Sequence, residues 1–387
     1  MARKYRIVSA DSHLEIPPDR WTPRVPARYR DRAPRTVKLA NGGDATLVEN
    51  QPLSVLGLAV TGKPYEEFKP TGVTYEGNPG TGSPEQRMRE QDQDGIDAEV
   101  IFTGPGNVRF WRGIADNEAF RAVIHAYNEF LAEEYCAAAP DRLIAIAVIP
   151  TTGIDDAIKE LEYCARAGLK GVMLATYPNG TGVPAPEDDR FWVAAIDLNM
   201  PLTVHVRLLT DERPVFRYRR RPSEAEVFAL DPVLNLVRFA GESALNAVQM
   251  IMAGIFDRFP KLRIYFAETM IGWIPYFLSQ LDDNYQRTRH WAERYYGLEP
   301  PPRPLGEYIR EHCWWGFISD RFGVEIRHRI GVDHVMWGSD FPHSAGNWPY
   351  SRKVIDATFE GVPEDERSLM VKGNAVKFFH LQDGLVA

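Results

Sequence analysis

Four separate segments of the chain place metal-binding side chains at or near the end of an apolar run. The first is Asp11-Ser12-His13, which closes an apolar run that begins at Arg6. Alternate residues of a strand point to the same face, so Asp11 and His13 project together. A carboxylate beside an imidazole suits Zn²⁺, Fe²⁺ or Mn²⁺. Together with this pair, three later residues in similar places predict a metal site: His205, Glu268 and Asp340.

Each of the three later residues also has an ordinary structural interpretation. A histidine in an apolar strand, such as His205, is commonly a hydrogen-bonded core residue. Asp340 could cap a helix or form a turn, and Glu268 could be a capping or ion-pairing carboxylate. However, a polar group at the end of a buried strand needs a partner, and metal ions would satisfy all five residues at once. The metal site is therefore the favoured interpretation.

Short apolar runs alternate with longer helical patterns, and these elements must position the five residues. Seven of the eight runs show little polar alternation, which is typical of parallel strands buried on both faces, while the aromatic run 314–319 is less regular. The pattern predicts a single-domain (β/α)₈ barrel over residues 1–387, with a rearranged doubly wound sheet as the alternative. The strand candidates are 6–10, 98–103, 143–149, 171–175, 202–206, 263–267, 314–319 and 334–338; the helix candidates are 117–139, 155–167, 191–198, 242–259 and 272–294.

Two long segments do not fit the repeat. Residues 16–87, after the first strand, are rich in Pro, Gly and polar residues, which indicates a cap or an oligomer contact. Residues 207–231 follow the fifth strand, so in a barrel both insertions lie on the C-terminal face. The second insertion carries Arg217 and the run 219–221. These arginines are either a solvated face or a site for the phosphate or carboxylate groups of an anionic substrate, such as a coenzyme A thioester.

The overall composition excludes several classes of protein. A net charge of -8 argues against a broad nucleic-acid interface. No apolar run approaches the length of a membrane span, and the N-terminal residues lead into a strand without a signal-like apolar region. The three cysteines are far apart and odd in number, which favours unpaired thiols. We therefore expect a cytoplasmic protein with a small-molecule substrate and no membrane partner; a homo-oligomer is compatible with the sequence.

Aromatic side chains gather near the same predicted strand ends. We expect most of them to pack the top of the barrel and one or two to line an apolar pocket. They are Trp273, Trp314, Trp315, Trp337, Phe341 and Trp348.

The motifs together resemble the amidohydrolase-related branch of the amidohydrolase superfamily, which includes aminocarboxymuconate-semialdehyde decarboxylase. The resemblance spans nearly the whole chain apart from the two insertions, and it implies a metal-bearing barrel. It implies that Asp11, His13, His205 and Asp340 bind the metal. The residues that carry it are Ser-Ala-Asp11-Ser-His13-Leu-Glu-Ile-Pro-Pro-Asp, Val-His205, Glu268-Thr-Met-Ile-Gly-Trp-Ile-Pro and Trp-Gly-Ser-Asp340-Phe-Pro-His343.

This chain departs from the pattern of that branch at two points. Asp11 stands where its decarboxylases usually have histidine or glutamate, and Glu268 stands on the strand where they use an acid–base histidine. The lysine that bridges two metals in many amidohydrolases is missing from strand four, residues 171–176. Glu268 could therefore act as the acid–base group, or it could bind or bridge a second metal ion.

Two activities are compatible with these residues. Our first expectation is a hydrolase that uses one or two Zn, Fe or Mn ions to activate water against an ester, thioester or amide bond. Asp340 would then be the general base, and the metal or His343 would stabilise an oxyanion. The alternative is a metal-dependent decarboxylase or hydratase that acts on an aromatic or unsaturated acid. A third interpretation is a barrel that binds a ligand without catalysing a reaction. His343 itself could equally be a supporting or surface residue.

Overall fold

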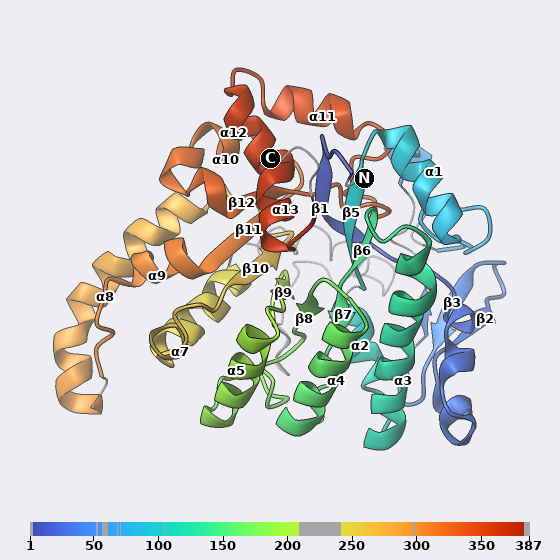
Figure 1. Ribbon diagram of the computed structural model, residues 1–387, viewed down its shortest axis with the longest axis horizontal. Helices are drawn as coiled ribbons and strands as arrows, with labels where there is room; N and C mark the ends of the chain where they lie inside the picture. Colours follow the sequence, from blue (N-terminus) through green and yellow to red (C-terminus); the bar gives the residue numbers. More distant parts are fainter. Residues whose placement is uncertain are drawn as a thin grey trace, which may run out of the picture.

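The computed structural model describes residues 3–51, 53–55, 61–67, 69, 71–103, 105–208, 241–297 and 299–382. Parallel strands form a central barrel, and helices lie around its outside (Figure 1). The strands pair in the orders β1-β5-β6 and β7-β8-β9-β10-β11-β12. A parallel bridge between Ser12 and Phe341 joins the two ends of this series.

The (β/α)₈ barrel predicted from the sequence is confirmed, and all eight strand candidates are strands. The third candidate is interrupted at Ile146 and forms two short strands, β6 and β7. The barrel strands are β1 Val8–His13, β5 Ala98–Phe102, β6 Leu143–Ala145, β7 Ala147–Val148, β8 Val172–Met173, β9 Leu202–His205, β10 Ile264–Ala267, β11 Cys313–Phe317 and β12 Val335–Trp337.

The register of the strands brings the candidate ligands to one end of the barrel. His13 lies beside Phe102 in the pairing of β1 with β5, and His205 lies beside Ala267 in the pairing of β9 with β10. Glu268 follows Ala267 directly, so it lies at the same end. Every residue of β1, β5, β9 and β10 is buried, which explains why their sequences lack polar alternation.

The predicted helices are also present, and their ends follow local signals. For example, Asp116 caps α3 (Asn117–Phe130) by accepting hydrogen bonds from the N–H groups of Glu118 and Ala119. The remainder of segment 117–139 continues as a π-helical turn, Leu131–Tyr135, and a 3₁₀ turn, Cys136–Ala138. Residues 241–252 are helical as well. The other helices are α1 Pro84–Asp94, α2 Pro105–Trp111, α3 Asn117–Phe130, α4 Ile154–Arg166, α5 Asp189–Asp197, α7 Ile255–Arg258, α8 Ile274–Tyr296, α9 Leu305–His312, α10 Arg321–Glu325, α11 Ser351–Thr358, α12 Glu364–Ser368 and α13 Asn374–Phe378.

The first insertion has structure of its own. Its strands β2 Arg35–Lys38, β3 Asp44–Leu47 and β4 Ser54–Val55 form an antiparallel sheet. This sheet lies near α3 in Figure 1, and the buried Trp21 packs against Trp111 and Tyr127. The insertion is thus attached to the barrel through aromatic contacts near α2 and α3.

The second insertion lies almost wholly outside the described residues, because the description stops at 208 and resumes at 241. The arginine run therefore stays a prediction. Within the described residues, no helix is both long enough and apolar enough to cross a membrane.

Candidate metal centre

The five residues expected to bind metal lie at the C-terminal ends of four barrel strands. Asp11 and His13 are in the last half of β1, and His205 ends β9. Glu268 and Asp340 follow β10 and β12. All five side chains are buried. In a (β/α)₈ barrel this end carries the catalytic groups, so the fold assembles the predicted residues where chemistry is expected.

The ligand atoms form two overlapping groups. Asp11, His13, His205 and Glu268 each place a ligand atom within 4.8 Å of the others, and a second group joins His13 to Asp340 and His343. His13 Nε2 lies 3.7 Å from Asp11 Oδ1 and 3.2 Å from Asp340 Oδ1. His205 Nε2 lies 3.2 Å from Asp11 Oδ1 and 3.7 Å from Glu268 Oε2. His13 therefore belongs to both groups.

Several of these buried atoms have no hydrogen-bond partner among the described residues. They are Asp11 Oδ2, both ring nitrogens of His13, His205 Nδ1 and both carboxylate oxygens of Asp340. Asp340 Oδ1 nevertheless lies within ion-pair distance of His13 Nε2 and His343 Nδ1. Buried polar atoms normally have partners, because an unsatisfied one costs free energy. Asp340 therefore does not act as a helix cap. Oxygen and imidazole nitrogen are the donors that Zn²⁺, Mn²⁺ and Fe²⁺ accept, so these residues fit a divalent cation.

The carboxylates differ strongly in their affinity for protons. Burial raises the pKa of Glu268 well above its usual value, and the charges of Asp340 and Asp11 raise it further. Burial would also raise the pKa of Asp340, but the adjacent His343 and His13 hold it below its usual value. In the metal-free protein, the carboxyl group of Glu268 therefore binds a proton more strongly than that of Asp340 does.

His343 is placed beside Asp340 rather than facing open space. Its Nδ1 lies 3.0 Å from Asp340 Oδ1, and its Nε2 lies 3.4 Å from Glu15 Oε1. Its ring stacks on His13 with centroids 3.9 Å apart. Burial lowers the pKa of His343, but the carboxylates of Asp340 and Glu15 outweigh this and raise it well above its usual value. Each ring nitrogen of His343 therefore lies within ion-pair distance of a carboxylate.

Glu15 is a site residue that the sequence analysis missed. It follows Asp11 and His13 at the same two-residue spacing, and this repeat was the available signal. Glu15 also lines a cavity of about 60 Å³, together with Thr103, which follows β5, and Asn107 on α2. The polar groups of this cavity lie next to the His343–Glu15 contact.

The backbone is strained where three strands end. Val206, Glu268 and Asp340 have φ angles of 59°, 56° and 53°, in the left-handed region that residues with a Cβ rarely adopt. Such conformations cost free energy and cluster at functional sites. Here each one lies at or directly beside a candidate ligand, which supports a functional role for this end of the barrel.

The ligand strands β1 and β12 approach closely because of a glycine. A Cβ atom added to Gly338 would lie 2.5 Å from Asp11 Cβ and 2.9 Å from Asp11 N. Just beyond it, the N–H of Ser339 donates to Ser9 Oγ, and the N–H of Asp340 donates to the carbonyl oxygen of Asp11. These contacts fix Asp11 and Asp340 relative to each other.

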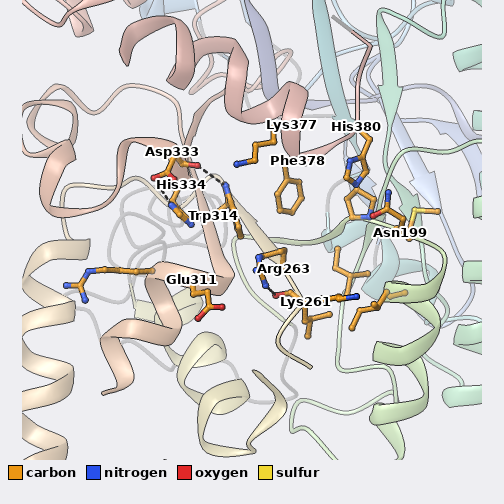
Figure 2. A pocket seen from close by; sticks show the side chains of 17 residues that line it. Asn199, Lys261, Arg263, Glu311, Trp314, Asp333, His334, Lys377, Phe378 and His380 are labelled. Atoms are coloured by element: carbon orange, nitrogen blue, oxygen red, sulfur yellow. Dashed lines mark hydrogen bonds and ion pairs between the residues drawn. The ribbon is translucent and has the colours of Figure 1, made fainter. Parts of the chain in front are cut away.

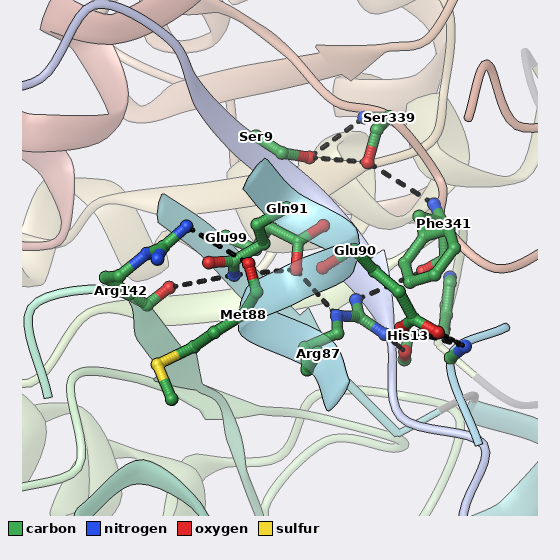
Figure 3. A network of polar contacts seen from close by, with 12 residues as sticks. Ser9, His13, Arg87, Met88, Glu90, Gln91, Glu99, Arg142, Ser339 and Phe341 are labelled. Atoms are coloured by element: carbon green, nitrogen blue, oxygen red, sulfur yellow. Dashed lines mark hydrogen bonds and ion pairs between the residues drawn. The ribbon is translucent and has the colours of Figure 1, made fainter. Parts of the chain in front are cut away.

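A buried arginine joins the same two segments from outside the barrel (Figure 3). Arg87 on α1 donates from Nη1 to the carbonyl oxygen of His13 at 2.8 Å and from Nη2 to that of Phe341 at 3.4 Å. Its Nε pairs with Glu99 Oε2 at 2.6 Å. The side chain is 1% exposed. The buried guanidinium group therefore links the backbone of His13 to the segment that carries Asp340.

One sequence expectation about the aromatic residues is wrong. Trp314 does not lie at the C-terminal end of the barrel, because it is the second residue of β11 and its side chain lines a cavity at the opposite end. Trp273 and Trp315 do pack together, with centroids 5.4 Å apart. The strand that contains Trp314 begins at Cys313, one residue earlier than the sequence predicted.

Comparison with known proteins agrees with the fold. Gamma-resorcylate decarboxylase from Rhizobium sp. (strain MTP-10005) is 25% identical over 310 residues, which cover 76% of this chain and 86% of the relative. An amidohydrolase structure from Mycobacterium avium subsp. paratuberculosis K-10 superposes with a TM-score of 0.71 at 19% identity, covering 99% of this chain and 100% of that one.

A second solved structure is that of 5-carboxyvanillate decarboxylase from Novosphingobium aromaticivorans, complexed with manganese and 4-hydroxy-3-methoxy-5-nitrobenzoic acid. It superposes with a TM-score of 0.66 at 17% identity and covers 97% of this chain and 96% of its own. The family model described as Amidohydrolase matches residues 10–381. This chain is therefore an enzyme of the amidohydrolase superfamily and belongs to its Amidohydrolase family.

Proposed function

We propose that this protein is a metal-dependent decarboxylase that removes CO₂ from a small aromatic carboxylic acid. The observation that carries the proposal is the group of buried, unpartnered ligand atoms around Asp11, His13 and Asp340. Two of the relatives named above, gamma-resorcylate decarboxylase and 5-carboxyvanillate decarboxylase, act on aromatic acids, and the structure of the second contains manganese. These two decarboxylases favour the second of the two activities expected from the sequence.

The proposed ligands are Asp11, His13, His205 and Asp340. When bound, a divalent cation would supply positive charge that attracts the oxygen atoms of an anionic substrate. His343 then acts as a positioning residue, because its Nδ1 contacts Asp340 while its Nε2 contacts Glu15.

Glu268 is the proposed proton donor. Decarboxylation of an aromatic acid adds a proton to the ring carbon that bears the carboxylate; the bond to the carboxylate carbon then breaks, its electron pair returns to the ring, and CO₂ leaves. The buried carboxyl of Glu268 lies 3.7 Å from His205 Nε2, at the edge of the ligand group, and its raised pKa favours the protonated form. Solvent returns the proton to Glu268 after each turnover.

Product analysis distinguishes this proposal from hydrolysis. The purified protein, supplied with Mn²⁺, is incubated separately with hydroxybenzoic acids, including 2,6-dihydroxybenzoate, and with aryl esters and acyl thioesters. We expect CO₂ and the corresponding phenol from at least one of the acids. Ester or thioester cleavage without CO₂ release from any aromatic acid would overturn the proposal in favour of the hydrolase.

A further inference from the structure

A larger cavity lies at the end of the barrel opposite the candidate metal centre. Its volume is about 770 Å³, within the range of small-molecule sites. Leu202 at the start of β9, Arg263 just before β10 and Trp314 near the start of β11 line it (Figure 2). The side chain of Phe378 on α13 forms a further part of the wall. None of these residues takes part in the proposed decarboxylation.

The cavity has positive groups that are not neutralised. Lys261 and Lys377 are exposed at its edge, on different elements. Among the described residues, neither lysine forms an ion pair with a carboxylate, and the same holds for Arg263. Arg263 instead donates from Nη1 to the backbone carbonyl oxygens of Pro260 and Leu262. Partial burial lowers the pKa of Arg263, as expected for a cation with few compensating charges.

The two carboxylates that line the cavity already have cationic or imidazole partners. Glu311 Oε2 lies 2.7 Å from Arg303 Nη1, and Asp333 Oδ1 lies 2.9 Å from His334 Nδ1. They also interact with Arg263 and Lys377, but the lining holds four cationic side chains, Lys261, Arg263, Arg310 and Lys377, against these two carboxylates. The net electrostatic preference of the cavity is for an anion.

The remaining wall is apolar. Phe378 and Trp314 lie with ring centroids 5.4 Å apart, and Ile196, Met200 and Leu202 complete this surface. A hydrated inorganic ion would leave such a surface uncovered, whereas an organic anion would place its charge at the lysines and its body against the rings.

From the charges and the apolar wall together, we propose that this cavity is a second binding site for a small organic anion with an aromatic body. The positive charges of Lys261, Arg263 and Lys377 attract the carboxylate of the ligand, and its ring lies against Phe378 and Trp314. The site is separate from the metal centre, and the proposal does not depend on the decarboxylase activity.

Calorimetric titration with 2-naphthoate tests the charge requirement. Lys261→Glu/Lys377→Glu should weaken binding by at least about tenfold, because two attractive charges become repulsive. Lys353→Glu is the matched control, since Lys353 is an exposed lysine on α11 outside the cavity. The neutral 2-naphthamide should bind more weakly than 2-naphthoate. Absence of binding, or equal affinity in the double variant and the control, would overturn the proposal.

A crystal soaked with 6-bromo-2-naphthoate locates the ligand. We expect an anomalous bromine peak near Phe378 and Trp314, whether or not a second molecule occupies the metal centre. A peak at the metal centre alone would contradict the proposal. Neither measurement involves turnover, so failure here is distinct from failure of the proposed decarboxylase.

Discussion

Glu268 is the residue on which the proposed chemistry depends most directly. It lies in a left-handed backbone conformation with φ of 56° at the end of β10. Burial and two neighbouring carboxylates raise its pKa. A metal ligand must lose its proton, whereas a general acid must keep one until the reaction. The raised pKa is compatible with Glu268 as the acid, but the pKa of the proposed ligand Asp11 is raised as well, so the two roles must be separated by experiment.

Replacement of Glu268 by glutamine separates these two roles. We expect Glu268→Gln to lower kcat by about 10²–10⁴-fold, the range for loss of a general acid, while the metal content stays at the wild-type level. Elemental analysis and steady-state rates measure the two effects. The exposed Glu307→Gln on α9 is the control and should change neither. Loss of metal in Glu268→Gln would instead make Glu268 a ligand.

In the metal-free protein, Glu268 should contribute a loss of stability as the pH rises above about 4.3, the usual pKa of an unfolded glutamate, whereas His13, whose pKa is lowered, contributes in the opposite direction. The folded state keeps the proton of Glu268 to higher pH than the unfolded state does, because its pKa is raised. Each such group contributes at most about 1.4 kcal/mol per pH unit, and Asp11 contributes in the same direction.

Urea unfolding of chelated protein between pH 4.5 and 8 measures this dependence. Glu268→Gln should show a flatter decline than the wild type, because an amide does not titrate. Parallel curves for the two proteins would show that Glu268 titrates normally in the folded state.

At the scale of the elements, the site depends on how β1 meets β12. Gly338 allows the two segments to approach, and backbone hydrogen bonds join Asp340 to Asp11. Arg87 holds the carbonyl oxygens of His13 and Phe341 from the side. The ligands of two strands are thereby positioned by contacts that do not involve their side chains.

Gly338→Ala tests the close approach. The added Cβ would lie 2.5 Å from Asp11 Cβ, so β1 and β12 must separate. Overpacking of this kind costs about 1–3 kcal/mol, and we expect weaker Mn²⁺ affinity as well as a lower Tm. Gly241→Ala is the control, because its added Cβ would contact none of the described residues within 4 Å. Unchanged Mn²⁺ affinity in Gly338→Ala would contradict the positioning role.

Arg87 offers a test that separates positioning from stability. Arg87→Met leaves Glu99 buried without its guanidinium partner and should cost about 3–5 kcal/mol. Arg87→Met/Glu99→Leu removes both charges and should recover most of that loss. We expect Mn²⁺ affinity to stay about 10–100-fold below the wild type in the double variant, because His13 loses its support. Recovery of both stability and affinity would limit Arg87 to a structural role.

For the whole molecule, local patterns in the sequence were sufficient to predict the barrel. Buried parallel strands have a distinctive composition, and strand ends of a barrel share one face, so Asp11 and His205 could be predicted as neighbours. The distances between side chains on different strands of the barrel cannot be predicted from local sequence patterns. The sequence therefore did not separate Asp340 and His343 from the group around Asp11.

Other features were missed for identifiable reasons. The antiparallel sheet β2–β4 is built from short, mostly polar strands, of which β2 and β4 have exposed positions, so no periodic apolar signal marks it. Trp314 was assigned to the wrong end because a run of aromatic residues does not show where its strand begins. The relatives, rather than the residues alone, favour decarboxylation over hydrolysis.

The central claim is that a divalent metal at this centre supports decarboxylation. The most direct measurement is the release of ¹³CO₂ from carboxyl-labelled hydroxybenzoic acids by the same preparation before chelation, after chelation and after Mn²⁺ is restored. We predict release from at least one acid, its loss on chelation and its recovery with Mn²⁺. If protein that holds about one metal ion per chain releases no ¹³CO₂ from any of the acids, the account is contradicted.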